Sequence, residues 1–339
     1  MAAPALRIPI IDLTGTFSSD ARDRVTIARR VGAASREIGM FYVTEHGISA
    51  SLIAAQFALA RAFFELDADE KRAIEVSRSN CFRGYEAFGT QTIDAAAPGD
   101  LKEGFIMGPE LTPDHPHVLA GYPNTGANLW PRRPAGFRRQ MEAYVAAING
   151  LGRRLAALLA LSLDVPEGYF SSALAEPLTY SQMLCYPPVP SDTGSKRLGA
   201  GAHVDWGLFT ILLQDDVGGL EILTPDTGWQ PAPPIRGSFV IILGEMVLRL
   251  TDGRYRSAKH RVVKNTSGHS RYSMPTFFDP DYDYRVACVP TCVAPGHAPR
   301  YPACSVAEHM RQMARGTLSV HAHPMSARHT DGRSSSDHQ

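Results

Sequence analysis

A histidine and an aspartate stand two positions apart, His203 and Asp205, at the front of an apolar run in GAGAHVDWGLFTILLQDDVGGLEIL (residues 199–223). In a β-strand, residues i and i+2 point to the same face. If both residues begin one strand, the imidazole and the carboxylate converge on one point. A core histidine beside a surface aspartate is also common, so the rest of the chain has to decide between a metal site and packing.

A third candidate ligand follows in a later β-like segment, His260 in GRYRSAKHRVV, beyond a tight-hairpin signal at Asp252–Gly253. Two imidazoles and one carboxylate on one side of an iron leave open positions, which is the facial triad of non-haem Fe(II) oxygenases. That chemistry requires O2 and an oxidisable co-substrate on the same metal. We therefore expect His203, Asp205 and His260 to hold one metal ion, although His260 in isolation fits an ordinary core histidine equally well.

The same i, i+2 spacing recurs in SRYSMPTFFDP, where Arg271 and Ser273 are expected to face one side of a strand. A guanidinium fork beside a hydroxyl suits a single carboxylate. An arginine in an apolar strand is costly unless it is paired. An internal Asp or Glu would satisfy this need, but a bound dicarboxylate that chelates iron at one end and meets Arg271 at the other explains more of the pattern.

The elements that must position these residues change character near Tyr180. Before it, apolar spacing predicts a strand over 8–13, helices over 20–38, 49–76 and 136–163, and a strand from Met40. After it come short β runs, including one across MVLRLTDGRYRSAKHRVV. Many short strands after a helical half predict an α+β fold with an antiparallel double sheet that closes on itself.

Composition narrows the function class. The chain of 339 residues carries 34 basic and 34 acidic residues, which gives no sign of nucleic acid or an anionic membrane as partner. Five scattered cysteines without a Cys-x-x-Cys pair favour a reducing compartment. The first residues lack a signal-peptide pattern, and the apolar stretch over 143–165 is interrupted by arginines. We expect a cytoplasmic protein, monomeric or homodimeric.

Together these residues resemble the isopenicillin N synthase-like family of Fe(II)- and 2-oxoglutarate-dependent dioxygenases. IPIIDL, GMFYVTEHGI, FFELDADEKRAI, CYPPVP and RYSMPTFFDP also look like that family's landmarks, so the resemblance covers roughly residues 8–315. It implies a distorted double-stranded β-helix, a jelly-roll core, flanked by α-helices. The expected parts are an N-terminal region (1–120), the jelly-roll core with its long support helix (121–325) and a disordered tail (326–339).

The resemblance also implies roles for individual residues. It assigns Fe(II) binding to His203, Asp205 and His260. It assigns the distal carboxylate of 2-oxoglutarate to Arg271, Ser273 and, as a helper, Tyr186. Where many plant members place an Asn near the metal-binding end of 2-oxoglutarate, this chain has Leu184, so that contact must come from elsewhere; Gln182 is a candidate polar wall residue.

The activity implied is oxidation of a C–H bond of a small molecule by hydroxylation, desaturation or ring formation, in secondary metabolism, with succinate and CO2 as co-products. Two alternatives remain. A 2-oxoglutarate-independent non-haem iron oxidase of the same fold would use Arg271 and Ser273 for its substrate's carboxylate. A Zn2+ hydrolase or a cupin-like metal-binding protein would use the same three ligands, although no Glu base stands beside His203 or His260.

The segment 79–108 resembles the substrate-side region of the family. Its candidate substrate residues, with one from the core, are Arg83, Tyr85, Phe105, Met107 and Phe278. Aromatic residues on such a segment serve packing as often as recognition. Arg83, in CFRGYEAFG, is either a solvated loop arginine or an anchor for a carboxylate or other polar group of a mostly apolar substrate.

Overall fold

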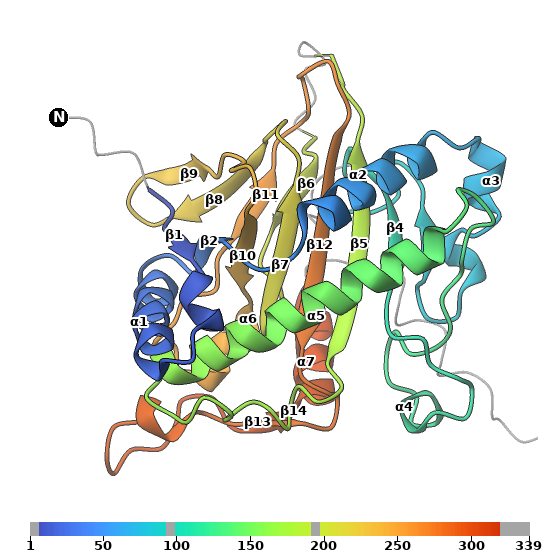
Figure 1. Cartoon of the computed structure of the whole chain (residues 1–339). Coiled ribbons are helices and arrows are strands. Elements are labelled where there is room, and N and C mark those ends of the chain that lie inside the picture. Colours follow the sequence, from blue (N-terminus) through green and yellow to red (C-terminus); the bar gives the residue numbers. More distant parts are fainter. Residues whose placement is uncertain (1–6, 93–98, 191–196, 319–339) are drawn as a thin grey trace, which may run out of the picture.

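The structure is a computed structural model that describes residues 7–92, 99–190 and 197–318, and its described part consists of two main sheets, a two-stranded sheet (β13, Arg285–Val286, and β14, Cys304–Ser305) and the surrounding helices (Figure 1). The tail expected over 326–339 lies outside the described residues. The strands are β1 (Ile10–Asp12), β2 (Met40–Thr44), β3 (Gly84–Glu86), β4 (Glu103–Met107), β5 (Leu178–Tyr186), β6 (Ala200–His203), β7 (Phe209–Gln214), β8 (Leu220–Thr224), β9 (Gly228–Pro231), β10 (Phe239–Leu243), β11 (His260–Val262), β12 (Arg271–Asp279), β13 (Arg285–Val286) and β14 (Cys304–Ser305).

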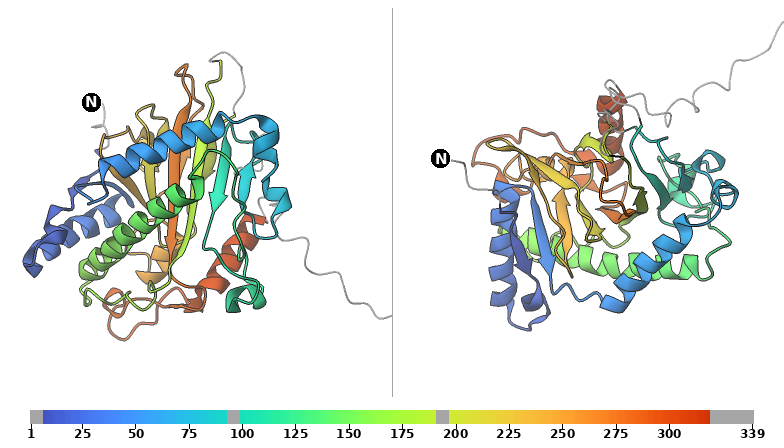
Figure 2. Two further views of the ribbon diagram at one scale, coloured as in Figure 1. Left: turned by 45° about the vertical axis from the view of Figure 1, so that its right-hand side comes forward. Right: turned by 90° about the horizontal axis from the view of Figure 1, so that it is seen from above.

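The longer helices are α1 (Ala21–Glu37), α2 (Ala50–Phe64), α5 (Phe137–Ser162) and α7 (Val306–Leu318). The shorter ones are α3 (Ala68–Arg72), α4 (Pro116–Leu119) and α6 (Glu245–Leu250). Helix α5 lies across one face of the large sheet with α2 beside it (Figure 1), whereas α7 lies on the opposite side of that sheet in the view from above (Figure 2). Helices α5 and α2 therefore cover one face of the large sheet, through their contacts with β5 and β12.

The large sheet has the strand order β1-β2-β10-β7-β12-β5-β4-β3, and the small sheet has the order β6-β11-β8-β9. Leu184 and Leu212 of the large sheet pack with Ile222 and Val262 of the small sheet in one buried cluster. The two sheets therefore face each other across an apolar interior, which is the expected jelly-roll core. The predicted α+β class and the predicted jelly roll are confirmed.

The N-terminal half contributes strands as well as helices. Strand β1 pairs in parallel with β2, and β2 continues the sheet beyond β10. At the other end, β4 pairs with β5 and the β3–β4 hairpin closes that side. Residues 84–86 and 103–107 are thereby held beside the core strands, so residues far from the metal-binding motifs in sequence reach the same interior.

Helix α5 is long and apolar enough, by length and composition, to cross a membrane. Its apolar residues are instead buried in the main core, among them Met141, Tyr144, Ile148 and Leu155. All five cysteines are free thiols. The apolar character of this helix is accounted for by its contacts with the sheet and its neighbouring helices.

Two predicted elements differ from the structure. The helix expected over 49–76 is divided, because α2 ends at Phe64 and α3 begins only at Ala68. The β run expected before Asp252 is helix α6, since Met246, Val247 and Leu250 are buried at helical spacing. Asp252–Gly253 therefore ends a helix instead of joining two strands, and both residues adopt positive φ angles, 52° and 78°.

Candidate active site

Three side chains from two sheet elements and one turn meet at the mouth of the jelly roll. His203 ends β6, His260 begins β11, and these two residues are direct partners in the antiparallel pairing of the strands. Oδ1 of Asp205 lies 3.5 Å from Nε2 of His203 and 3.9 Å from Nε2 of His260. One ligand atom from each residue lies within 4.8 Å of the other two, so the three can hold one metal ion.

Asp205 reaches this point differently from the sequence-based expectation. It does not share a strand with His203, because β6 ends at His203 and the next strand begins at Phe209. Its turn is fixed by hydrogen bonds instead: the Thr210 hydroxyl donates to Asp205 Oδ2 at 2.5 Å, and the amide of Glu245 donates to the Asp205 carbonyl at 2.8 Å. The direction of the Asp205 carboxylate is therefore set by this turn and not by strand alternation.

The imidazoles are held in the tautomer that a metal requires. Nδ1 of His203 lies 2.7 Å from the carbonyl of Gly201, and Nδ1 of His260 lies 3.0 Å from the carbonyl of Ala258. A carbonyl only accepts, so each Nδ1 carries the proton and each Nε2 is bare. Burial, reinforced by the charge of His260, lowers the pKa of His203 to about 4. Two neutral nitrogens and one carboxylate fit Fe(II).

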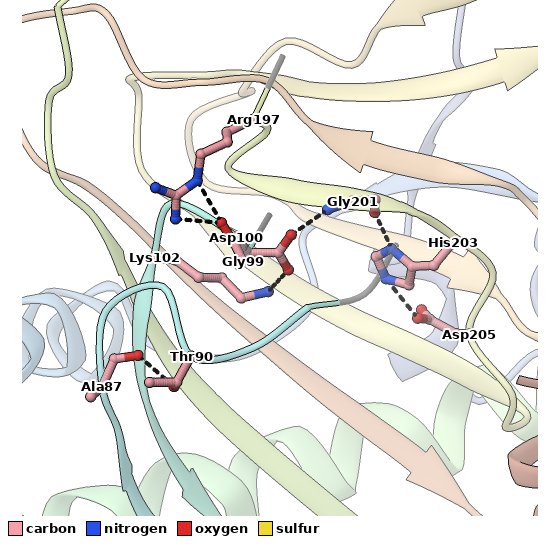
Figure 3. A network of polar contacts seen from close by, with 9 residues as sticks. All are labelled: Ala87, Thr90, Gly99, Asp100, Lys102, Arg197, Gly201, His203 and Asp205. Atoms are coloured by element: carbon pink, nitrogen blue, oxygen red, sulfur yellow. Dashed lines mark hydrogen bonds and ion pairs between the residues drawn. The ribbon is translucent and has the colours of Figure 1, made fainter. Parts of the chain in front are cut away.

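A network from the N-terminal half supports His203 (Figure 3). The Gly201 amide, whose carbonyl holds His203, donates to Asp100 Oδ1 at 3.0 Å. Asp100 Oδ2 in turn lies 3.3 Å from Nζ of Lys102. Sequence reasoning missed Asp100 and Lys102, although two charged residues at i, i+2 in GDLKEGF were a usable signal for one buried polar face.

The guanidinium of Arg271 is surrounded by Ser273, Gln214 and Tyr186, which we call the Arg271 box, and among the described residues it forms no ion pair with a carboxylate. Its side chain is 1% exposed and stacks over the Tyr186 ring, with 4.7 Å between Cζ and the ring centroid. It donates to Ser273 Oγ at 3.2 Å and to Gln214 Oε1 at 3.3 Å. Its Nε is buried with no partner within the described residues. No internal Asp or Glu forms an ion pair with Arg271 there, so an anionic ligand such as a dicarboxylate fits this box.

Four predicted substrate residues lie on the helix side of the large sheet. Tyr85, Phe105, Met107 and Phe278 all belong to the main core cluster. Phe105 packs edge to face against Phe63 and Phe137, and a Cβ at Gly152 of α5 would stand 2.6 Å from the Phe278 ring. On β12, Phe278 points away from the face that carries Arg271 and Ser273. The structure does not bring these four residues to the metal ligands.

Arg83 is buried, not solvated. It is 1% exposed, and its guanidinium stacks over Tyr180 at 4.6 Å. It donates to the carbonyl of Cys81 at 3.1 Å and to the carbonyl of Asn124 at 2.5 Å. These bonds tie the strand-entry segment before β3 to the loop that contains Asn124.

Comparison with known proteins agrees with this geometry. Residues 8–133 match the family model described as non-haem dioxygenase in morphine synthesis N-terminal, and residues 178–280 match that of the 2OG-Fe(II) oxygenase superfamily. A protein of Emericella nidulans named 2-oxoglutarate-Fe(II) type oxidoreductase hxnY is 35% identical over 308 residues, which cover 89% of this chain and 88% of that protein.

Solved structures of other proteins show a similar overall fold. A Caulobacter crescentus protein described as a member of the 2OG-Fe(II) oxygenase family is 30% identical, with a TM-score of 0.80, over 91% of this chain and 99% of that chain. JOX2 in complex with 2OG, Fe and JA is 27% identical, with a TM-score of 0.75, over 92% of this chain and 86% of that chain.

Proposed function

Because this chain belongs to the 2OG-Fe(II) oxygenase superfamily, we propose that His203, Asp205 and His260 hold its Fe(II). The protein is an Fe(II)- and 2-oxoglutarate-dependent oxygenase of a small molecule. The observation that carries the assignment of ligands is the meeting of two bare Nε2 atoms and one carboxylate oxygen within metal-bridging distance.

Arg271, Ser273 and Tyr186 are assigned to the distal carboxylate of 2-oxoglutarate. The guanidinium offers two parallel donors, the hydroxyl offers a third, and the Tyr186 ring closes one side. The unpartnered Nε of Arg271 supports this assignment, since a buried arginine without an anion is costly. The alternative in which the box holds the substrate's own carboxylate loses support, because the relatives are named for 2-oxoglutarate.

Bound Fe(II) supplies oxidation of a substrate C–H bond by O2, while 2-oxoglutarate is converted to succinate and CO2. The chain contributes binding, orientation and exclusion of water. The carbonyls of Gly201 and Ala258 orient the two imidazoles, and Thr210 orients the Asp205 carboxylate. The apolar interior between the two sheets keeps bulk water from the reacting centre.

Hydroxylation, desaturation and ring formation are three outcomes of this one C–H oxidation, which we place in secondary metabolism. We also place the protein in the cytoplasm, as a monomer or homodimer without a nucleic-acid or membrane partner. Five free cysteines and a formal net charge of zero support this assignment.

The test of the function is spectroscopic. Anaerobic addition of Fe(II) and 2-oxoglutarate together is expected to produce a weak visible charge-transfer band, absent with either alone. Zn2+ in place of Fe(II) is the control for metal binding without this chemistry. Admission of O2 is then expected to bleach the band and yield succinate. A protein that binds Fe(II) but shows no band with 2-oxoglutarate would instead be the 2-oxoglutarate-independent oxidase.

A further inference from the structure

One row of residues crosses the large sheet from its edge to the co-substrate box. Glu86 pairs with Gly104, Gly104 with Leu184, and Leu184 with Ser273. Direct partners in neighbouring strands share a face of the sheet. Glu86 therefore points to the interior that carries Arg271 and Ser273, away from the helix-side core.

The Glu86 carboxylate is buried and has no partner among the described residues. The residue is 5% exposed, and no hydrogen bond or ion pair reaches its side chain from the part of the chain that the structure describes. Its Oε2 lies 3.8 Å from the place where a Cβ of Gly104 would stand, beside the Leu184 side chain. Because residue 104 is a glycine, no side chain of that residue lies between the Glu86 carboxylate and Leu184.

Lys102 lies on the same face as Glu86, two residues before Gly104. The carbonyl of Lys102 accepts from the amide of Gly89, so the hairpin pairing continues through this residue. Lys102 is 4% exposed, and within residues 7–92, 99–190 and 197–318 its Nζ is paired with Asp100 alone, at 3.3 Å. An ammonium group has three donors, so two remain for another ligand.

The charges act on each other and on the metal site. Burial raises the pKa of Glu86, the charge of Lys102 opposes this rise, and the charge of Asp100 adds to it. The charge of Lys102 also contributes to the lowered pKa of His203. Lys102 is connected to the metal site through Asp100, which accepts from the Gly201 amide.

A pair with a purely structural role lies on the other face of the same strand. Lys71 and Glu103 form an ion pair at 2.8 Å, and the Tyr85 hydroxyl donates to the same Glu103 oxygen at 2.6 Å. Glu86 and Lys102 form no such pair among the described residues, although both are buried. Two opposite charges that are near but not joined leave an acceptor and a donor for one bridging ligand.

We propose that Glu86 and Lys102 bind the polar edge of the primary substrate, as a continuation of the proposed function. The ligand class is a small molecule whose edge carries an N–H or O–H donor beside a carbonyl or anionic oxygen, as in an aromatic lactam. The donor meets the Glu86 carboxylate and the oxygen meets the Lys102 ammonium group. A substrate held by this edge lies beside His203.

The first test compares two probes on the unmodified protein, loaded with Fe(II) and 2-oxoglutarate without O2. 2-Pyridone has the donor–acceptor edge, whereas 1-methyl-2-pyridone keeps the oxygen and lacks the donor. A charge-assisted hydrogen bond corresponds to about a tenfold difference in affinity. Ligand-observed NMR titration is expected to show 2-pyridone binding about tenfold more tightly. Equal affinities, or no binding of 2-pyridone, would overturn the proposal.

The second test separates the two residues. Glu86→Met is expected to abolish the preference for 2-pyridone, whereas Lys102→Met should weaken both probes about tenfold. Glu221→Met, on the outer face of β8 beside Arg261, is the matched control and should bind both as the parent does. The proposal fails if Glu86→Met keeps the preference, or if Lys102→Met weakens 2-oxoglutarate but neither pyridone.

The charge-transfer band of the unmodified protein with Fe(II) and 2-oxoglutarate distinguishes a failure of the substrate-binding proposal from a failure of the proposed function. If the band forms and the pyridones fail, the substrate edge is wrong and the oxygenase function stands. If the band does not form, the proposed function itself fails.

Discussion

The ring centroids of His203 and His260 lie 4.3 Å apart where β6 and β11 pair. Each ring is fixed by the backbone carbonyl two residues before it, Gly201 in one strand and Ala258 in the other. The two histidines therefore have equivalent supports, and both direct a bare nitrogen at Asp205. The roles of the residues that form this geometry can be tested by mutation and titration.

Replacing His260 with Ala removes one of the two nitrogen ligands that we propose for Fe(II). We expect Fe(II) affinity and turnover to be lost, because the remaining imidazole and carboxylate complete only part of the facial triad. The fold should survive, because the backbone pairing of β11 with β8 does not depend on the His260 side chain. Calorimetric Fe(II) titration and circular dichroism check both parts. Full activity in this variant would rule out the metal site.

Arg271→Lys keeps the positive charge but loses the planar two-donor fork that faces Ser273 and Gln214. A charge-assisted hydrogen bond contributes about 1.5–3 kcal/mol, so the apparent affinity for 2-oxoglutarate should fall about tenfold or more. The dependence of the charge-transfer band on 2-oxoglutarate concentration measures this. An unchanged dependence would assign the Arg271 box to the substrate instead.

Asp100 is a positioning residue, because it acts on His203 through the Gly201 peptide. Asp100→Ala should lower Fe(II) affinity about tenfold, in the range typical of losing a group that orients a metal ligand. Asp100→Asn should restore most of it, since its amide oxygen can still accept from the Gly201 amide. Fe(II) titration of both variants is the measurement. Equal loss in both would point to the Asp100–Lys102 charge pair instead.

Arg83 is expected to support structure. Arg83→Met keeps the stem over Tyr180 but removes the donor to the carbonyl of Cys81 and one of two donors to the carbonyl of Asn124, which keeps its hydrogen bond from the Tyr180 hydroxyl. A buried group left unsatisfied costs about 1–3 kcal/mol, so the free energy of unfolding should fall by about that amount. Urea unfolding measures this. Substrate-coupled and uncoupled turnover should decline together; loss of the coupled reaction alone would restore the role of substrate anchor.

Because the pKa of Glu86 is raised, we expect the free energy of unfolding of the metal-free protein to depend on pH. The folded-state pKa lies above the unfolded value near 4.5, so the folded state binds more proton between the two. The stability contribution of Glu86 therefore falls as pH rises through this window. Glu86→Gln removes that fall, so its stability relative to the parent should rise from pH 4.5 upward. Urea unfolding at several pH values checks the sign, and a constant difference would contradict it.

Local patterns in the sequence were sufficient for several features. Strand alternation placed Arg271 and Ser273 on one face, and His260 was assigned to a strand beside His203; both expectations match the structure. Helical spacing located α1 and α5 to within a few residues. These features depend on neighbours along the chain and on the pairing of adjacent strands. Hydrophobic periodicity and turn residues in the sequence encode both.

Other features required the tertiary structure. Every residue of β4 is buried, because helices cover one face of the sheet and the second sheet covers the other. Alternation then places Phe105 and Gly104 on opposite faces of the sheet but does not decide which of them shares a face with Arg271 and Ser273. Pairing with β3 and β5 decides it, and it places Glu86 in the row of Ser273.

Asp205 shows the same limit on a shorter scale. Its type and spacing identified it as a metal ligand candidate, but its direction comes from a turn held by Thr210 and Glu245. Asp100 reaches the site through the Gly201 amide, across a sequence separation of 101 residues. The sequence by itself determined which chemical groups are available, whereas long-range hydrogen bonds and strand order decided which of them meet, because those contacts form only when the sheet is complete.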